Sequence, residues 1–394
     1  MNIIVQKYGG SSVSDKNKII KVAKKIKQKV SLGFKLIVVV SAMGKTTDNL
    51  LNLAKEISKN PNPRELDMLL TTGEQMSVSL LTMALHEINI KAKSLNSFQA
   101  EINTLGNHNN AKIKDIKKDK IIKFLKENDV LVITGFQGIN PNGDLTTLGR
   151  GGSDTSAVAL AAALKSNCEI YSDYPIYTID PKLYKNAKKI NKITYDEMLE
   201  MASLGSNILH SRAVEIAKKF NVKLYCASTF SNEGGTYVIS NTIENPVVTG
   251  MSLMKNQTRV NITNLPENHP LLHGIFENLS QKFNVDMISL ISIDNKINVS
   301  LSIIEEEMKD FDKYLQKALQ NIDNSKVSYE HGYVKLSVVG IGMKTEKGVA
   351  SRFFKSLQNI PIKLVTTSEI KISCLIEKEN TAKAIDCLVK EFDL

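Results

Sequence analysis

Short apolar runs alternate with amphipathic segments through the first part of the chain, up to Asn241. Leu36–Val40 is apolar at every position, which predicts a strand buried on both faces of a sheet. Val130–Thr134 and Glu169–Ser172 repeat this pattern, and helical spacing of apolar residues runs through Ile19–Ile26. The alternation predicts βαβ units around a mostly parallel sheet, and therefore an α/β fold.

Each of these predicted strands ends in a polar or glycine-rich turn. Ser41–Gly44 follows the first strand, Gly135 follows the second, and Ser172 closes the third. Open α/β sheets bind their ligands at the carboxyl ends of parallel strands. We therefore expect the chemistry at this edge of the sheet.

An internal repeat begins after Asn241. Its two copies align if one residue is dropped before the last pair of matching positions. The matching apolar positions are Val260, Ile262, Phe276, Leu279 and Val285 in one copy, and Val334, Leu336, Phe354, Leu357 and Ile362 in the other. Each copy has the order strand, loop, helix, strand. We expect a large domain at residues 1–241 and two α+β modules within 246–394: the first at about 258–327, the second at about 332–394 with a strand from 246–255.

Composition excludes disorder and argues against a nucleic-acid partner. The chain has 394 residues, 42% of them apolar, which is enough to bury a large core. Its net charge of +10 comes from lysine, because there are only five arginines. The lysines are expected on solvated helix faces, such as an amphipathic helix at Lys112–Lys126, and no basic patch is interleaved with aromatic residues.

Cysteine spacing and the start of the chain indicate the compartment. The four cysteines lack CxxC spacing and partner histidines, so we expect reduced, buried thiols and no metal site. A short strand-like run, Ile3–Val5, opens the chain, and no apolar stretch is long enough for a signal peptide or a membrane span. A soluble cytoplasmic protein is expected.

Lys7 and the pair Gly9 and Gly10 follow the first strand and precede a helix. Adjacent glycines let backbone N–H groups approach an anion, a helix N-terminus adds partial positive charge, and the lysine supplies a full charge. A plain Gly-Gly turn with a surface lysine is the alternative.

The segment Gly44-Lys45-Thr46 is not a P-loop, because that motif needs a glycine where this chain has Val39. The hydroxyls around it suit either a small polar substrate or a helix cap, with Asp48 as the capping candidate.

Arg150 and Asp154 lie among three glycines that lead into an Ala-rich helix ending at Leu164. Such a segment suits an anion at a helix start, with the arginine free to pair with a carboxylate.

These motifs resemble those of aspartokinases, within the amino-acid kinase family, over nearly the whole chain. The matching segments are KYGGSS from Lys7, SAMGKTTDNL from Ser41, TTGEQMS from Thr71, GFQG from Gly135, GRGGSDTSA from Gly149, NVDMI from Asn284 and SEIKIS from Ser368. The resemblance implies a three-layer α/β/α kinase domain followed by two ferredoxin-like ACT modules that dimerise and bind amino-acid effectors. It implies transfer of the γ-phosphoryl group of ATP to the side chain of L-aspartate, the first step of lysine, threonine and methionine biosynthesis through diaminopimelate.

The resemblance also implies roles for residues. Lys7 and Asp154 would be catalytic, and Mg²⁺ would arrive with ATP. The ATP-binding set would be Lys7, Gly9, Gly10, Ser11, Ser172, Asp173, Tyr177, Asp180 and Lys182. The aspartate-binding set would be Ser41, Thr47, Glu74, Phe136, Arg150, Gly152 and Ser153. Asp286 and Ser289 would contact a lysine or threonine effector. The histidines, His210 among them, are expected to be structural.

The chain departs from the family pattern in its nucleotide segment. The loop from Ser172 to Tyr177 is one residue short, and many members have lysine at the position of Asn207. Losing a phosphate-facing cation weakens nucleotide binding, so we expect a high Michaelis constant for ATP, which steady-state kinetics would measure. His269-Pro270 replaces the Pro-Gly turn typical of the effector pocket, which leaves feedback control open.

Two alternatives stay open at the level of sequence. One is another amino-acid kinase, acting on glutamate, acetylglutamate or a nucleoside monophosphate, although such relatives generally lack the repeat that carries SEIKIS. The other is a kinase-like regulatory subunit that senses amino acids, although Lys7, Glu74, Arg150 and Asp154 are all present.

Overall fold

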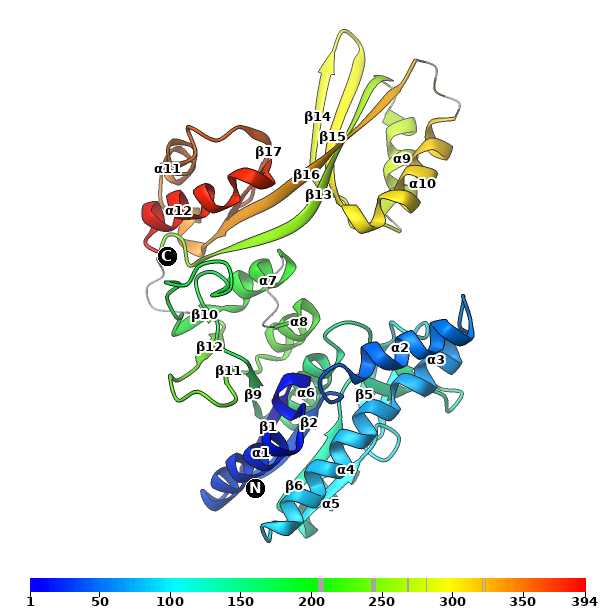
Figure 1. The fold of residues 1–394 in the computed structure, drawn as a ribbon, viewed down its shortest axis with the longest axis vertical. Coiled ribbons are helices and arrows are strands. Elements are labelled where there is room, and N and C mark those ends of the chain that lie inside the picture. Colours follow the sequence, from blue (N-terminus) through cyan, green and yellow to red (C-terminus); the bar gives the residue numbers. More distant parts are fainter. Residues whose placement is uncertain (205–208, 242–245, 268, 281, 321, 323) are drawn as a thin grey trace. The chain divides into compact units, whose positions relative to one another are not determined.

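The computed structural model describes residues 1–204, 209–241, 246–267, 269–280, 282–320, 322 and 324–394 (Figure 1). The chain forms two compact units. The first contains residues 1–177, 189–203 and 209–241, and the second contains residues 178–188, residue 204 and the described residues from 246 to 394. The segment 178–188 therefore packs with the second unit, although it lies within the range predicted for the first domain. Asn207 lies outside the described residues.

Eight strands form the main sheet of the first unit, in the order β10-β12-β11-β9-β1-β2-β6-β3. Their bounds are β1 Ile3–Tyr8, β2 Lys35–Val40, β3 Ala92–Leu95, β6 Val130–Thr134, β9 Asn167–Ser172, β10 Lys192–Thr194, β11 Leu224–Ser228 and β12 Thr236–Ile239. Adjacent strands are parallel, except that β12 runs antiparallel to β11. The predicted α/β fold with a mostly parallel sheet is confirmed.

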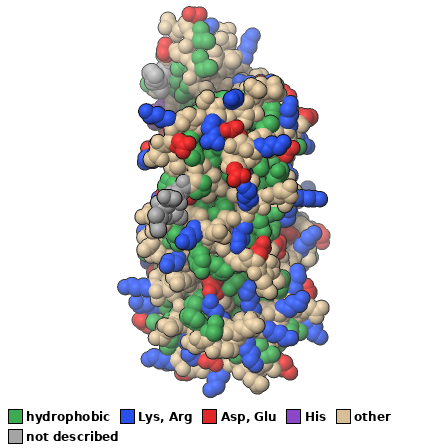
Figure 2. Space-filling model, turned by 90° about the vertical axis from the view of Figure 1, so that its left-hand side faces the viewer, with side chains coloured by type: hydrophobic (Ala, Val, Ile, Leu, Met, Phe, Trp, Pro, Cys, Tyr) green, Lys and Arg blue, Asp and Glu red, His purple; other side chains and the backbone are tan. Residues whose placement is uncertain are grey.

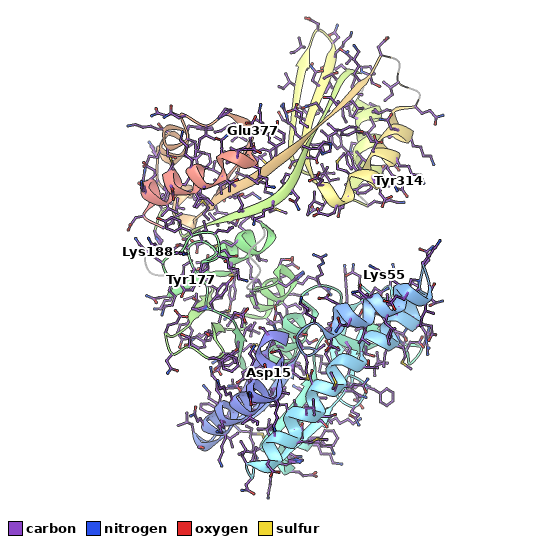
Figure 3. All side chains as sticks on the ribbon, viewed as in Figure 1. Asp15, Lys55, Tyr177, Lys188, Tyr314 and Glu377 are labelled. Carbon is purple, nitrogen blue, oxygen red and sulfur yellow. The ribbon has the colours of Figure 1, made fainter. Side chains whose placement is uncertain are left out.

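Helices cover both faces of this sheet, because β1 and β2 carry apolar side chains on both. Apolar residues of α1 (Lys16–Ser31) and α4 (Thr72–Glu87) share one core with Ile4 and Tyr8, and the two helices lie side by side (Figure 1). Lys7 points to the opposite face, where α6 (Gly152–Leu164) packs against β1 and β2. The carboxylate of Asp15 caps α1 by accepting a hydrogen bond from the N–H of Lys18 at 3.1 Å (Figure 3).

A smaller sheet of four strands, β5-β4-β7-β8, lies beside the carboxyl ends of the main strands. The bounds are β4 Ile102–Leu105, β5 Lys112–Ile116, β7 Gln137–Ile139 and β8 Leu145–Thr147. The helix predicted for Lys112–Lys126 is wrong in its first part, because that part pairs with β4 as a strand and only Lys118–Glu127 is helical, as α5. Sequence periodicity over so short a span does not separate an edge strand from a helix.

The remaining helices of the first unit are α2 Thr46–Ile57, α3 Pro63–Leu70, α7 Tyr195–Ser203 and α8 Ser211–Phe220, with a 3-10 turn, η1, at Gly10–Val13. Asp48 is not the cap of α2. Lys45 occupies that position and makes no side-chain capping bond. Asp48 lies in the first turn, where its negative charge interacts favourably with the positive end of the helix dipole.

The second unit is built on one antiparallel sheet of six strands, in the order β14-β15-β13-β16-β18-β17. The bounds are β13 Gly250–Pro266, β14 Asp286–Ile293, β15 Lys296–Ile304, β16 Lys326–Val339, β17 Ile362–Thr367 and β18 Lys371–Glu377, with helices α9 His269–Ser280, α10 Met308–Leu319, α11 Val349–Ser356 and α12 Thr381–Phe392. The long strands β13 and β16 pair along nearly their whole length and contribute to two separate hydrophobic cores. Each core has its own pair of helices, so the two α+β modules share their central strands.

Surface charge and free thiols complete the description. Lysine and arginine side chains are interspersed with acidic and apolar ones over the face seen in Figure 2. Cys168, Cys226 and Cys374 are buried, Cys387 is half-buried, and all are free thiols. No helix within the described ranges is long and apolar enough to cross a membrane.

Candidate active site

Four neighbouring parallel strands, β9, β1, β2 and β6, end at one edge of the main sheet. Backbone hydrogen bonds continue the ladder past the strand ends and hold the turns together. The N–H of Gly9 donates to Tyr171 O at 3.3 Å, that of Ser41 to Tyr8 O at 3.2 Å, and that of Gly135 to Val40 O at 3.0 Å. The turns predicted to carry the chemistry therefore lie side by side.

Lys7 and Asp154 form an ion pair at this edge. Lys7 Nζ lies 2.6 Å from Asp154 Oδ1, and the two side chains are only 12% and 11% exposed. The carboxylate comes from the first turn of α6, so it also faces the positive end of that helix dipole. A mostly buried ammonium group near the carboxyl ends of parallel strands is suited to stabilising phosphoryl oxygens.

The glycine pair brings the first two turns into contact. Gly44 N donates to Gly10 O at 3.0 Å. A Cβ atom on Gly10 would lie 2.6 Å from Ala42 O, and one on Gly9 would lie 3.5 Å from Lys7 Nζ. Only glycine at position 10 allows this approach of the two backbones, while position 9 leaves open space beside the ammonium group.

We predict that Gly10→Ala lowers kcat/KM about tenfold, because the added methyl group pushes the Ser41–Gly44 turn away from Lys7 and misplacement of this order is costly in phosphoryl transfer. Steady-state kinetics with both substrates measures the effect. Gly274→Ala in α9 is the control, since its Cβ would meet nothing within 4 Å. Equal kinetics for the two variants would contradict the prediction.

Glu74 reaches the same edge from the first turn of α4. It is 2% exposed, and its Oε1 accepts a hydrogen bond from Ala42 N at 3.0 Å. Its Oε2 is buried and has no hydrogen-bond partner among the described residues. Burial raises the pKa of Glu74 from 4.5 to about 7, partly offset by the bond from Ala42. A buried carboxylate oxygen without a donor is suited to receive a ligand's ammonium group.

Thr134 is a polar residue of this edge that the sequence analysis did not single out. It ends β6, is fully buried, and its hydroxyl has no hydrogen-bond partner within the described part of the chain. The signal was present, because it is the one polar position of an otherwise apolar strand.

The Gly149–Gly152 turn is shaped by close contacts with the turn after β6. Gly151 has φ +67° and begins α6 as its N-cap. A Cβ on Gly152 would lie 2.8 Å from the Phe136 ring, and one on Gly135 would lie 2.7 Å from Ser153. Phe136 itself has φ +68°, and its N–H donates to Ser156 Oγ at 3.1 Å. Four of the predicted substrate residues, Phe136, Arg150, Gly152 and Ser153, are thus brought together, with Arg150 exposed.

The other predicted substrate residues lie on the turn after β2. Ser41 is half-buried directly after the strand, and Thr47 is half-buried in the first turn of α2. Glu74 contacts this turn through Ala42 because Gly73 lets α4 approach it, with a built Cβ only 2.9 Å from the Ala42 side chain.

The predicted nucleotide residues divide between the two units. Ser172 is the last residue of β9 and the exposed Asp173 follows it, where Ser228 Oγ donates to Asp173 O at 3.0 Å. Tyr177 donates from its hydroxyl to Glu233 Oε2 at 2.6 Å, which raises the pKa of the tyrosine to about 12. Asp180 and Lys182 lie in segment 178–188 and belong to the second unit. Gly9, Gly10 and Ser11 lie in the turn directly after β1, with Ser11 exposed.

The predicted effector residues lie on β14 of the second unit. Asp286 forms an ion pair with Lys335, a lysine that is 2% exposed. Burial acts to raise the pKa of Asp286, but the ion pair with Lys335 is among the contacts that outweigh it, so the pKa lies below its ordinary value. Ser289 is half-buried and lies opposite Ser300 of β15, past an irregularity in the strand.

Comparisons with known proteins show the family and the fold of the chain. A family model described as "Amino acid kinase family" matches residues 2–228, and an ACT domain model matches residues 336–392. An aspartokinase of Bacillus sp. MGA3 is 44% identical over 100% of this chain and 98% of its own length, and one of Geobacillus stearothermophilus is 45% identical with the same coverage. The fold matches a crystal structure of E. coli aspartokinase III in complex with aspartate and ADP, at a TM-score of 0.83 and 23% identity, with both chains covered completely.

The resemblance noted in the sequence is therefore confirmed over the whole length of the chain. A kinase-family model spans more than half of it, and full-length relatives are well above the identity at which family membership is secure. The chain belongs to the aspartokinases, within the amino acid kinase family.

Proposed function

We propose that the protein transfers the γ-phosphoryl group of ATP to the side-chain carboxylate of L-aspartate, giving ADP and 4-phospho-L-aspartate. The observation that carries this proposal is the Lys7–Asp154 pair at the edge where four parallel strands end. A carboxylate with a pKa of about 3.9 is already ionised at neutral pH, so the reaction needs no general base. Catalysis then consists of aligning two anions and neutralising charge.

In this mechanism Lys7 stabilises the negative charge on the transferring phosphoryl group, and Asp154 holds Lys7 in place. The space left beside the lysine by the missing Cβ of Gly9 suits phosphate oxygens. Mg²⁺ bound to the nucleotide would neutralise further charge on the phosphates.

The acceptor is oriented by charge at both ends. Glu74 offers its unpartnered Oε2 to the ammonium group of aspartate, and Arg150 pairs with a carboxylate. Ser41, Thr47, Phe136, Gly152 and Ser153 complete the aspartate site. Gly9, Gly10, Ser11, Ser172, Asp173 and Tyr177 of the first unit would contribute to the ATP site.

A second part of the proposal concerns regulation, assembly and the metabolic pathway. The paired modules would bind a lysine or threonine effector near Asp286 and Ser289 and join two chains into a homodimer. The reaction would be the first step of lysine, threonine and methionine biosynthesis in the cytoplasm. Titrating activity with lysine and threonine, separately and together, distinguishes the possible effectors.

An ADP-release assay with a panel of acceptors tests the activity. We expect turnover with L-aspartate and little with glutamate, acetylglutamate or nucleoside monophosphates. Turnover only with another acceptor would replace aspartate as the substrate. No ADP release with any acceptor would favour a regulatory subunit instead.

A further inference from the structure

Arg212 joins two separate loops beneath the Arg150 turn. It lies in the first turn of α8, and its guanidinium donates to Leu148 O and, at 2.9 Å, to Ala111 O. Leu148 and Ala111 are both fully buried. A guanidinium can bridge two carbonyls because its N–H groups spread in a planar fork, whereas lysine offers a single nitrogen.

The first of these carbonyls lies at the point where the Arg150 turn begins. Leu148 is two residues before Arg150, and its own N–H donates to Phe136 O at 2.9 Å. The turn then closes on itself, since Gly152 N donates to Gly149 O at 3.1 Å. The position of Leu148 therefore determines where Arg150 is presented.

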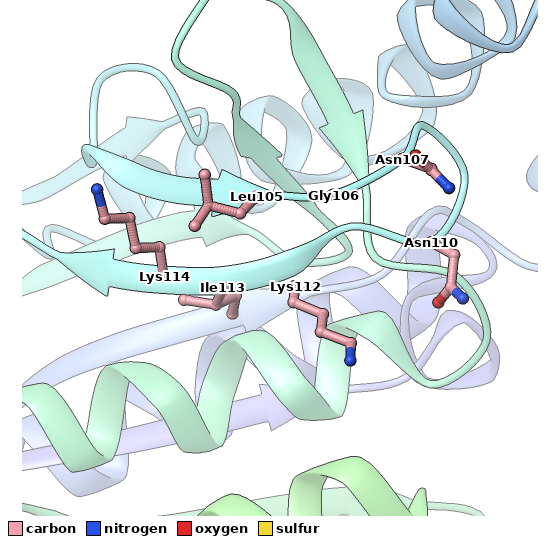
Figure 4. A pocket seen from close by; sticks show the side chains of 7 residues that line it. All are labelled: Leu105, Gly106, Asn107, Asn110, Lys112, Ile113 and Lys114. Carbon is pink, nitrogen blue, oxygen red and sulfur yellow. The ribbon is translucent and has the colours of Figure 1, made fainter.

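The second carbonyl belongs to the hairpin between β4 and β5. Ala111 N donates to Thr147 O at 2.9 Å, and a Cβ on Gly149 would lie 3.1 Å from Asn109 O, so the hairpin lies directly against the Arg150 turn. Its outer side borders a pocket of about 470 Å³ (Figure 4). Asn107 and Asn110 at its tip are exposed, so little packing holds the hairpin from that side.

On its inner side the hairpin is held by Asp67 of α3. This fully buried carboxylate accepts hydrogen bonds from Asn109 N at 3.1 Å and from the hydroxyl of Thr147 at 2.6 Å, and His108 Nδ1 lies 2.8 Å from it. Asp67 and Arg212 thus anchor the same two segments, the hairpin and the end of β8, from different helices.

The start of α8 also packs directly against the Arg150 turn. A Cβ on Gly151 would lie only 2.1 Å from the His210 ring, so the ring occupies the space beside that glycine. His210 in turn caps α8 by accepting a hydrogen bond from Arg212 N at 3.4 Å. The structural role expected for this histidine is consistent with these contacts.

We propose that Arg212 is a positioning residue for the acceptor site: it holds the end of β8 and the β4–β5 hairpin together, so that Arg150 is presented in the orientation that binds the acceptor carboxylate. Asp67 secures the same hairpin from the other side. The inference rests on the proposed function in one respect, namely that Arg150 binds aspartate.

Kinetics of Arg212→Met and Arg212→Lys test this role. We expect KM for aspartate to rise about tenfold in Arg212→Met, because hydrogen bonds from a charged group to buried carbonyls are lost, while KM for ATP stays within about twofold. Arg212→Lys should recover part of the loss, since one nitrogen can serve one carbonyl. The matched control is Lys218→Met, which removes the exposed pair with Asp196 from the same helix. Unchanged KM for aspartate, or an equal rise for both substrates, would overturn the proposal.

Hydrogen–deuterium exchange of the full chain supplies a readout that does not depend on activity. In Arg212→Met, amides of peptides covering 108–111 and 147–153 should exchange faster, while those of β1 and β2 should not change. Unchanged exchange in both peptides would refute the anchoring. Faster exchange in a protein that does not phosphorylate aspartate would leave the anchoring intact and count against the proposed function instead.

Discussion

Replacing Lys7 by methionine is expected to lower kcat by about 10³-fold or more, because the cation that stabilises the transferring phosphoryl group is removed while most of the unbranched side chain is kept. Lys7 is only 12% exposed and lies at the edge where the strand ends meet, so solvent ions cannot replace its charge efficiently. Single-turnover and steady-state measurements at saturating ATP and aspartate would isolate the loss in kcat from changes in binding.

Stability must be separated from catalysis in this experiment. Removing Lys7 leaves Asp154 buried without its cation, which is costly to the fold. The double variant Lys7→Met/Asp154→Asn removes both charges and should restore thermal stability but not activity. Lys35→Met, which breaks a more exposed pair with Asp129 at the other end of the sheet, is the control. Near-normal turnover of a folded Lys7→Met protein would exclude Lys7 from the mechanism.

Glu74→Gln is expected to raise KM for aspartate about 100-fold, because an amide replaces the carboxylate that would receive the ammonium group, and charge-assisted hydrogen bonds are the stronger kind. The pH dependence gives the sharper test. Since the pKa of Glu74 is raised to about 7, kcat/KM for aspartate should increase as pH rises through about 7. In Glu74→Gln this increase should disappear, and a persisting one would assign the titration to another group.

The same carboxylate should make the protein less stable at high pH. Its folded pKa of about 7 lies above its ordinary value of 4.5, so between these values the folded state binds the proton that the unfolded state has lost. The free energy of unfolding therefore falls as pH rises from about 4.5 to 7, by a few kcal/mol in total. The Tm of Glu74→Gln minus that of wild type should therefore be higher at pH 8 than at pH 5. Glu87→Gln, exposed at the other end of α4, should show no such gain.

The main sheet could be predicted because its strands are buried on both faces. Val130–Thr134 has the bounds expected of it, and Leu36–Val40 is extended by one residue. The small sheet is not predicted from the sequence, since its strands are only three to five residues long and β5 resembles a helical face in its spacing of isoleucines. The sequence repeat aligns Phe354 with Phe276, but in α11 the fully buried ring is that of Phe353 and Phe354 is exposed. A shift of one position along a helix is enough to change which side chain faces the core.

The sequence indicates which residues are candidates for the site, but not which of them contact one another. Lys7 and Asp154 stand in motifs that indicate anion binding, whereas their pairing depends on α6 crossing β1 in the folded chain. The unpartnered oxygen of Glu74 and the two carbonyls bridged by Arg212 are properties of three-dimensional packing alone. No spacing of residue types along the chain reports them.

The strands β13 and β16 join the two repeats into one folded unit, because each strand runs through both. A bend or a slip of either strand in one half alters the hydrogen-bonded ladder in the other, since the same backbone runs through both. The β13–β16 ladder is irregular between Met254 and Arg259, where the two halves meet. The halves also cannot be separated by cutting the chain at a loop, because any division that keeps both cores would sever a paired strand. The two sequence repeats therefore form one folded unit and not two independent domains.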